Sequence, residues 1–574
     1  MHETGPQMKT WLNVACTAAA AFLAGAASSS DLGQPREKWR PVEKKIIAAG
    51  WDIGSSSPEE ILECAEEFDK TGVDGVVFRA NFVTDVQGRK VRLTSENDVM
   101  ESTNISERTL GVFVPTLKKL TSGHRAFRHS FYGCYWTPYN GHRISWTNDA
   151  AWALFASNMK VVASVARRGG AVGIRVDAED YGSIGQYWRK PFEPPMSELA
   201  AVARGRGRQI GRAVFGEIPN VRLMSYWLLS LNESYATSED PARAMVGKGD
   251  LWPLFLNGIL DVMPPEAMLV DGDEHAYWYH PGSHKFEWSY VNQRMRALSL
   301  VSPENRDKYR RQMRVGFGQY LDNYTDPKRA LYKLGPEGFR QCLEDAIYTS
   351  DEYVWLYGEK RRWVKWPNLK FLAWMKIQPE TWGESIPDFS RTLMEAKEPA
   401  LRKERLLADC KRSGAPNLLG AAMKRKSSNW QRERDSHGTF TVLPGKGTDG
   451  STAVAAESVA SGCHVLDFSG PVKEGAEFVA EGYGRGPGLC AVCARWKKDG
   501  VWRRTPCAEA AFGKPDKDGW RRFSLRVRVP PEENGLALQI GLCQREGERS
   551  VIERVVGYMA TPPTEHHKEV QDGK

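Results

Sequence analysis

The chain has 574 residues, 41% of them hydrophobic and 26% charged, which is typical of a soluble globular protein with more than one domain. Its 79 basic and 71 acidic side chains leave a net charge of +8 that is spread along the sequence. No P-loop, zinc-finger spacing or basic-aromatic motif accompanies this charge, so a nucleic-acid partner is not expected.

The first residues have the pattern of a secretory signal. Lys9 precedes an apolar run from Trp11 to Ala24, and Ala24-Gly25-Ala26 fits a cleavage site. We therefore expect Met8 to be the initiator, residues 1–26 to be removed, and the protein to be secreted or periplasmic. The run has roughly 14 apolar residues where a membrane span needs about 20, so membrane insertion is not expected.

Cysteine usage does not predict a complete disulfide framework. Ten cysteines are present, and Cys16 would leave with the signal, so an odd number remains. Cys490 and Cys493 form a lone C-x-x-C without a second pair at zinc-finger spacing, which argues against bound zinc. We expect buried thiols or one disulfide in the C-terminal domain, and no metal or other cofactor.

Between residues 45 and 410, short apolar runs alternate with longer segments of helical period. Eight such units predict an α/β fold, an enlarged (β/α)8 TIM barrel. An open doubly wound sheet is the alternative, but no G-x-G-x-x-G follows the first strand. The predicted strands are 45–53, 73–82, 127–136, 171–176, 221–231, 267–271, 315–321 and 353–357. The predicted helices are 57–71, 105–120, 150–168, 196–215, 240–263, 285–300 with a second helical piece, 336–347 and 389–407.

The C-terminal part has short strands separated by Gly and Pro. Apolar and polar residues alternate over 523–529, the period of a half-buried strand, so an all-β sandwich is predicted. The expected order is a signal over 1–26, a leader over 27–44, the barrel over 45–410, a linker over 411–436, the sandwich over 437–562 and a polar tail over 563–574. The run from Trp520 to Ile540 resembles the last strands of jelly-roll carbohydrate-binding modules. Where such modules often carry an acidic pair before the final strand, this chain has only Glu553.

The fourth predicted strand ends in acidic residues, Gly173-Ile174-Arg175-Val176-Asp177-Ala178-Glu179. In a barrel of this kind the active site lies at the carboxyl ends of the strands. Residues 175, 177 and 179 share one face by strand alternation, so Asp177 and Glu179 are expected to point together into the barrel mouth. Mutual repulsion then raises one pKa and keeps a proton available for general acid catalysis.

This stretch resembles the catalytic strand of chitinase-type barrels, in which a D-x-x-D-x-D-x-E motif ends in a proton-donating Glu. The match covers Asp177 and Glu179, and Arg175 stands where that family has an earlier Asp. The chain also resembles barrel glycosidases that place an acid/base Glu after strand four and a second carboxylate on a later strand. Either resemblance implies that Glu179 is the acid/base.

Three later strand ends offer a second carboxylate. Glu359 ends the eighth strand beside aromatic residues and is favoured, while Asp271 and Glu274 follow the sixth strand and Asp322 follows the seventh. Other strand ends supply side chains suited to binding sugar hydroxyls and ring faces. These candidate contacts are Asp52, Arg79, Asn81, Trp136, Tyr139, His142, Tyr226, Trp227, Tyr277, Trp355 and Tyr357.

These patterns together predict a glycoside hydrolase that cleaves a poly- or oligosaccharide by carboxylate acid/base catalysis. The basic pI of about 8.8 adds an anionic polysaccharide to the candidate substrates. A glycan-binding protein that keeps the barrel without the chemistry is the alternative. A metal-dependent hydrolase on the same fold is disfavoured because neither H-x-H nor H-E-x-x-H occurs.

Overall fold

The structure is a computed structural model, and the chain divides into two units, residues 1–43 and 44–574. The described residues are 42–79, 81–86, 89–94, 99–100, 104–138, 143–179, 184–367, 375–423, 438–458, 462–473, 475–503, 508–530 and 532–560. The expected signal, most of the leader, part of the linker and the polar tail lie outside these ranges. Export therefore stays a prediction. Within the described part, no helix is both long and apolar enough to cross a membrane.

A parallel sheet forms the first domain, with the strand order β10-β11-β1-β2-β5-β6-β7-β8-β9. Only Gly316 separates β9 from β10, and β9 pairs with β8 while β10 pairs with β11. The two ends of the sheet are therefore one interrupted strand, and the sheet closes as a (β/α)8 TIM barrel, as predicted. The strands are β1 (Lys45–Gly50), β2 (Gly75–Phe78), β5 (Phe131–Tyr135), β6 (Gly173–Asp177), β7 (Arg222–Ser225), β8 (Met268–Asp271), β9 (Met313–Val315), β10 (Phe317–Tyr320) and β11 (Tyr353–Gly358).

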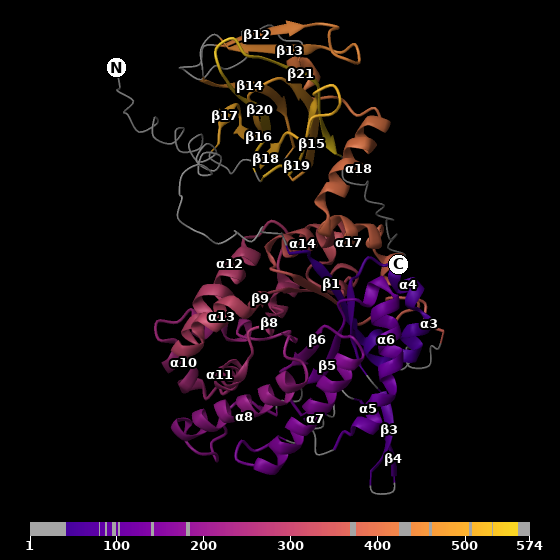
Figure 1. The fold of residues 1–574 in the computed structure, drawn as a ribbon, viewed down its shortest axis with the longest axis vertical. Helices are drawn as coiled ribbons and strands as arrows, with labels where there is room; N and C mark the ends of the chain where they lie inside the picture. Colours follow the sequence, from indigo (N-terminus) through magenta and orange to yellow (C-terminus); the bar gives the residue numbers. More distant parts are fainter. Residues whose placement is uncertain are drawn as a thin grey trace, which may run out of the picture. The chain divides into compact units, whose positions relative to one another are not determined.

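Helices follow the strands and lie around the outside of the sheet (Figure 1). Local signals fix several of their ends. Ser57 forms a capping box with Glu60 at the start of α3, and the Asn148 side chain accepts a hydrogen bond from Ala151 N at the start of α7. The barrel helices are α2 (Trp51–Ser55), α3 (Pro58–Glu63), α4 (Ala65–Asp69), α5 (Glu107–Leu110), α6 (Val114–Gly123), α7 (Asp149–Arg168), α8 (Met196–Glu217), α9 (Glu233–Ala236), α10 (Pro241–Lys248), α11 (Trp252–Val262), α12 (Lys285–Val291), α13 (Arg306–Gln312), α14 (Gly335–Thr349), α16 (Trp382–Ser385), α17 (Phe389–Lys397) and α18 (Pro399–Arg412).

A hairpin that the sequence pattern did not predict follows β2. Its strands β3 (Asn81–Val86) and β4 (Arg89–Thr94) pair with each other in antiparallel register. The predicted second strand, 73–82, therefore ends at Phe78, and its last residues begin this separate hairpin.

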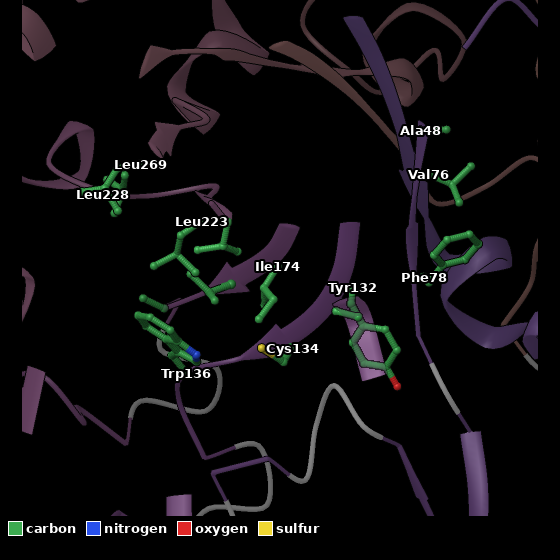
Figure 2. Close-up of a cluster of buried hydrophobic side chains, with 14 of the residues drawn as sticks. Ala48, Val76, Phe78, Tyr132, Cys134, Trp136, Ile174, Leu223, Leu228 and Leu269 are labelled. Carbon is green, nitrogen blue, oxygen red and sulfur yellow. The ribbon is translucent and has the colours of Figure 1, made fainter. Parts of the chain in front are cut away.

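Strand alternation divides the barrel into two cores. Outward-facing residues such as Ala48, Val76, Ile174 and Leu223 pack under the helices in one continuous apolar cluster (Figure 2). Inward-facing residues form a second cluster, rich in aromatic rings, inside the barrel. The interior is thus a packed core whose upper layer forms the floor of the barrel mouth.

The C-terminal domain is a β-sandwich, as predicted. One antiparallel sheet has the order β12-β13-β21-β15-β19, and the other has the order β14-β20-β16-β17 with β18 paired to β16. Apolar residues of both sheets share one core, which Leu419 and Met423 also enter. The strands are β12 (Gly438–Leu443), β13 (Ala453–Ser458), β14 (Gly462–Pro471), β15 (Glu477–Arg485), β16 (Leu489–Lys498), β17 (Val501–Trp502), β18 (Ala508–Ala511), β19 (Arg521–Arg528), β20 (Gly535–Gln544) and β21 (Arg549–Ala560), and α19 (Gly420–Met423) precedes them.

The sandwich contains a disulfide-bonded cysteine, Cys543, whose cross-strand neighbour in β14 is Cys463. Cys64, Cys342 and Cys410 are buried free thiols, and Cys490 is an exposed one. Of the two expectations, buried thiols or one disulfide in the C-terminal domain, the sandwich itself shows the disulfide at Cys543.

Helix α18 contacts the sandwich directly. Leu406, Leu407 and Cys410 of α18 form an apolar cluster with Val479 of β15 and Tyr558 of β21. Polar contacts continue this junction around Glu477, which receives hydrogen bonds from Arg402 Nε at 3.1 Å and from Arg526 Nε at 2.8 Å. Arg340 of α14 lies 3.7 Å from the same carboxylate. Because these partners come from α14, α18 and β19, Glu477 links the barrel to the sandwich.

Candidate functional site

Two charged residues of β6 face the interior at the carboxyl end of the barrel. Arg175 and Asp177 are each 2% exposed, and Arg175 Nη1 lies 3.5 Å from Asp177 Oδ2. The guanidinium also stacks on Tyr226, with Cζ 4.6 Å from the centre of the ring. Arg175 therefore places a fixed positive charge in the floor of the barrel mouth.

Glu179 leaves the strand instead of continuing its alternation. The strand ends at Asp177, whose Oδ1 accepts a hydrogen bond from Glu179 N at 2.9 Å, and Glu179 O accepts one from Thr137 Oγ1 at 2.7 Å. The Glu179 side chain is exposed. Asp177 thus shapes the turn that presents Glu179 above the barrel floor.

Three acids lie at or just after the end of β8, and each has different contacts. Asp271 is fully buried and accepts hydrogen bonds from Ser230 N at 2.8 Å and Leu228 N at 3.3 Å, so it holds the loop after β7. Burial raises the pKa of Asp271 to about 6 despite these bonds. The buried Asp273 accepts a hydrogen bond from Tyr279 Oη at 3.3 Å, and its φ of 36° is left-handed. This strained turn directly precedes Glu274.

Glu274 is the acid of this group whose pKa is influenced by Asp177 at the end of β6 and by Glu179 after it. Burial raises its pKa to about 9, with further contributions from the negative charges of Asp177 and then Glu179. Arg175 and a hydrogen bond from Trp227 act in the opposite direction but do not outweigh burial. Glu274 is therefore protonated at neutral pH. The sequence pattern predicted a raised pKa within the pair of Asp177 and Glu179, whereas the raised pKa described here is that of Glu274, the second acid after β8.

A pocket of about 210 Å³ is lined in part by Glu179 and by Trp227. Its walls contain four aromatic side chains, and Glu179 is exposed at its edge. The Asp250 carboxylate in the wall is buried. It accepts hydrogen bonds from Trp252 N at 2.9 Å and from Asn232 Nδ2 at 2.7 Å. The lining residues are Ala178, Glu179, Tyr187, Trp188, Trp227, Leu231, Asp250 and Trp252.

The loop that carries Trp188 is held firmly against the barrel. Arg189 N donates to Gly249 O at 2.7 Å, and Leu251 N donates to Tyr187 O at 2.8 Å. Arg143 binds Glu193 with an Nη2–Oε2 distance of 2.9 Å. Trp188 was not among the predicted contacts, although it follows strand four in a run of aromatic residues, Tyr187-Trp188, that could have indicated a binding loop.

Most of the predicted aromatic contacts form the barrel floor. Tyr226 stacks on Trp355 with ring centres 3.6 Å apart, and Tyr277 lies 5.3 Å from Trp355. Gly272 and Gly318 make room for Trp355, because a Cβ on either would lie under 3 Å from its indole ring. Tyr357 lies 6.2 Å from Trp355 on the same floor. Trp227 is the predicted aromatic contact that also lines the pocket.

Glu359, the favoured second carboxylate, belongs to a different group. Burial raises the pKa of Glu359, and the negative charge of Asp322 adds to this. A hydrogen bond from Tyr320 and the positive charge of Lys360 lower it. Asp322 is buried and accepts hydrogen bonds from Glu359 N at 2.8 Å and Lys360 N at 3.2 Å, so it fixes the end of β11. The pKa of Glu274, by contrast, is influenced by the charges of Asp177, Glu179 and Arg175. Glu274 therefore belongs with the acids at the end of β6 and after it.

Two predicted sugar contacts, Trp136 and Asp52, are fully buried in the barrel wall, and Trp355 of the floor is fully buried as well. Trp136 is fully buried in the outer core (Figure 2). Its ring centre lies 5.7 Å from that of Phe255. Asp52 is also fully buried. Its Oδ2 accepts hydrogen bonds from Trp363 N at 2.7 Å and from Trp366 Nε1 at 3.0 Å. Both residues stabilise the barrel wall, so the predicted substrate contacts at these positions are wrong.

Of the four remaining predicted contacts, the structure describes the side chain of Arg79 alone. Arg79 lies at the end of β2 within the electrostatic reach of Tyr357. Tyr139 and His142 fall outside the described residues, and the side chain of Asn81 is not among those described. Within the described part, no group of three or more His, Cys, Asp and Glu residues is arranged to hold a metal ion.

Comparison with known proteins gives similarities of chain arrangement only. No family model matches the sequence, and no curated protein matches it. A GH30 endoxylanase from Clostridium papyrosolvens C71 is similar over 88% of this chain and 98% of that chain, with 10% identity and a TM-score of 0.33. The carbohydrate-binding module TmCBM61, solved with β-1,4-galactotriose, covers 25% of this chain and 99% of its own, with 14% identity and a TM-score of 0.20. The enzymatically active domain of bacteriophage CBA120 tailspike protein 4 is matched over 25% of this chain and 21% of its own, with 14% identity and a TM-score of 0.21.

Proposed function

We propose that this chain is a glycoside hydrolase in which Glu274 donates the proton to the leaving glycosidic oxygen. The feature that supports this proposal is a half-buried carboxyl after β8 whose pKa is raised to about 9 by burial and by the negative charges of Asp177 and Glu179. A general acid for glycosidic cleavage needs this combination, because it must hold a proton at the pH at which a neighbouring carboxylate is ionised.

Glu179 is the proposed second carboxylate. Its side chain is exposed at the edge of the pocket, whereas Asp177 is buried against Arg175 and bound to the turn. Glu179 either takes the proton of an attacking water or attacks the anomeric carbon itself before water releases the sugar. In both routes the proton of Glu274 goes to the leaving oxygen and water adds to the anomeric carbon. The anomer formed first, read by NMR, distinguishes the two routes.

The pocket supports a neutral sugar ring as the group bound next to the acids. Trp188 and Trp227 offer flat apolar faces that suit the C–H face of a pyranose. The charged residues that line this pocket, Glu179 and Asp250, are both acidic. Because a uronate or sulfate at this position would face like charge, we propose a neutral residue here, in place of the anionic polysaccharide suggested by the pI.

The test is a screen of the purified protein against neutral and anionic polysaccharides, with Glu274→Gln as the matched variant. We expect reducing ends to appear from a neutral polysaccharide, and Glu274→Gln to lower kcat on the order of 10²–10⁴-fold, the usual effect of losing a general acid. Glu359→Gln serves as the control carboxyl on the other side of the mouth and should change kcat far less. Full activity of Glu274→Gln would contradict the assignment.

A further inference from the structure

The two residues that follow Asp273 contact the same aromatic side chain of the pocket, that of Trp227. Glu274 and His275 begin the short 3₁₀ helix η5 (Glu274–Trp278). The Trp227 indole, which is a donor only, gives a hydrogen bond to the Glu274 carboxyl. The His275 ring packs at right angles to the indole, with ring centres 4.5 Å apart and planes at 81°. One indole therefore contacts the proposed acid, a histidine and the pocket in which the sugar is proposed to bind.

The backbone around Trp227 is fixed by bonds within and between two loops. Trp227 N donates to Ser225 Oγ at 3.2 Å. Glu274 N donates to Tyr226 O at 3.3 Å, and Gly272 N donates to Ser225 O at 2.7 Å. These bonds hold the turn after β7 against the turn after β8. They do not set the side-chain torsions of Trp227, so the direction of the indole depends on what its ring contacts.

His275 is held on its other side by the buried Asp273. Its Nδ1 lies 3.4 Å from Asp273 Oδ1, and the two side chains are 44% and 1% exposed. The Asp273 carboxylate is fixed in turn, because its Oδ2 accepts hydrogen bonds from Tyr279 Oη at 3.3 Å and from Ser289 Oγ of α12. The imidazole therefore has one nitrogen at an immobile carboxylate and its ring against Trp227.

The groups that act on His275 differ from those that act on Glu274. Burial alone would lower the pKa of His275, but the contact with Asp273 outweighs burial and raises it. The charges of Glu233 and Asp271 act in the same direction as Asp273. Glu274 is influenced by the charges of Asp177, Glu179 and Arg175 and by the hydrogen bond from Trp227. Of these groups, Trp227 is the one that His275 contacts.

We propose that His275 is a positioning residue for the proposed acid, because its ring holds the Trp227 indole in the orientation that hydrogen-bonds Glu274. The use of this arrangement in catalysis rests on the proposed function, whereas the arrangement itself does not. A hydrogen bond donated to a carboxylate favours the ionised form. The indole therefore helps to set the pH at which Glu274 loses its proton, and His275 acts on that pH through the indole.

The experiment measures the pKa of Glu274 in the full chain without substrate. Infrared difference spectra over a pH series follow the carbonyl band of the protonated carboxyl, and Glu274→Gln identifies that band. Without the hydrogen bond the carboxylate is less stable, so Trp227→Phe and His275→Ala should each move the midpoint of the band to a pH higher by about 0.5–1. The double variant should move it no further than Trp227→Phe alone, because both changes remove the same bond.

Two further variants separate ring packing from other effects. His275→Phe keeps a flat ring against the indole and should return the midpoint close to that of the parent. His280→Ala removes an exposed histidine of the same loop and is the matched control, with no expected change. In each variant that hydrolyses a glycan, the basic limb of the pH–rate profile should move with the infrared midpoint.

Three results would overturn the proposal. The first is a midpoint that His275→Ala or Trp227→Phe does not move. The second is a double variant in which the two shifts add, since His275 would then act on Glu274 by a separate route. The third is an equal shift in His275→Ala and in His275→Phe or His280→Ala. Full hydrolytic activity of Glu274→Gln would instead overturn the proposed function, and the infrared midpoints would still decide whether His275 positions Trp227.

Discussion

Arg175 Nη1 lies 3.5 Å from Asp177 Oδ2, and both side chains are almost completely buried in the barrel floor. The pair sets the electrostatics of the mouth. Arg175 lowers the pKa of Glu274, while the negative charge of Asp177 raises it. The two members of this ion pair thus act in opposite directions on the pKa of Glu274.

Arg175→Met tests this relationship by removing the charge while keeping much of the side-chain volume. Because Arg175 lowers the pKa of Glu274, its loss should raise that pKa further and move the basic limb of the pH–rate profile to higher pH. The variant should also unfold more easily, by about 3–5 kcal/mol, since Asp177 loses a buried partner. Arg175→Lys, which keeps the charge, should leave the basic limb near its original position. A limb that is unchanged in Arg175→Met would contradict the assigned role.

Glu274→Gln should change the pH dependence of stability. The pKa of Glu274 is about 9 in the folded protein and 4.5 in its ordinary state, so the folded form binds more protons between these values. Stability therefore falls as pH rises through this window. Glutamine has no proton to lose, so the variant should have the higher Tm at pH 8.5, and this advantage should shrink toward pH 4.5. Calorimetric scans at several pH values measure it, and a Tm difference independent of pH would argue against the raised pKa.

Trp188→Ala should weaken polysaccharide binding without altering the chemical step. Trp188 lines the pocket beside Glu179 and is 37% exposed. We expect KM for a polymer to rise about tenfold at similar kcat, and small activated glycosides to be unaffected, since a contact made equally before and during reaction changes KM alone. Phe192→Ala is the matched control, because Phe192 follows in the same loop, is 84% exposed and does not line the pocket. An equal effect of both changes would argue against a pocket-specific role.

Glu477→Gln should loosen the junction between barrel and sandwich. Burial alone would raise the pKa of Glu477, but Arg340, Arg402 and Arg526 outweigh it and lower the pKa to about 2. The stabilisation is thus present above pH 4.5 and is lost as pH falls toward 2. At neutral pH the variant should lose about 3–5 kcal/mol, because three arginines keep their charge without this partner. Glu532→Gln, which removes an exposed pair with Lys498, should leave the midpoint of urea unfolding nearly unchanged.

The fold was accessible from the sequence because its signals are local. The predicted strands 171–176 and 353–357 are short, mostly apolar runs that alternate with helical periods, which is typical of a buried parallel sheet. The observed strands β6 and β11 match these runs to within two residues. The sandwich was likewise evident from the period of two over 523–529, which is β19 and the residue after it.

The position of acidic residues after β6 and β8 was also determined by the sequence, and Glu274 was among the candidates. What it did not determine was which acid holds the proton. That depends on the left-handed turn at Asp273, on the end of β6 at Asp177, and on the depth to which Glu274 is buried beside the carboxylates of another strand. Trp136 and Trp188 both follow strands in the sequence, yet one is sealed in the outer core and the other lines the pocket. Strand period and composition act over a few neighbouring residues, whereas burial and pKa are sums over side chains far apart in the chain, so only the tertiary structure decided them.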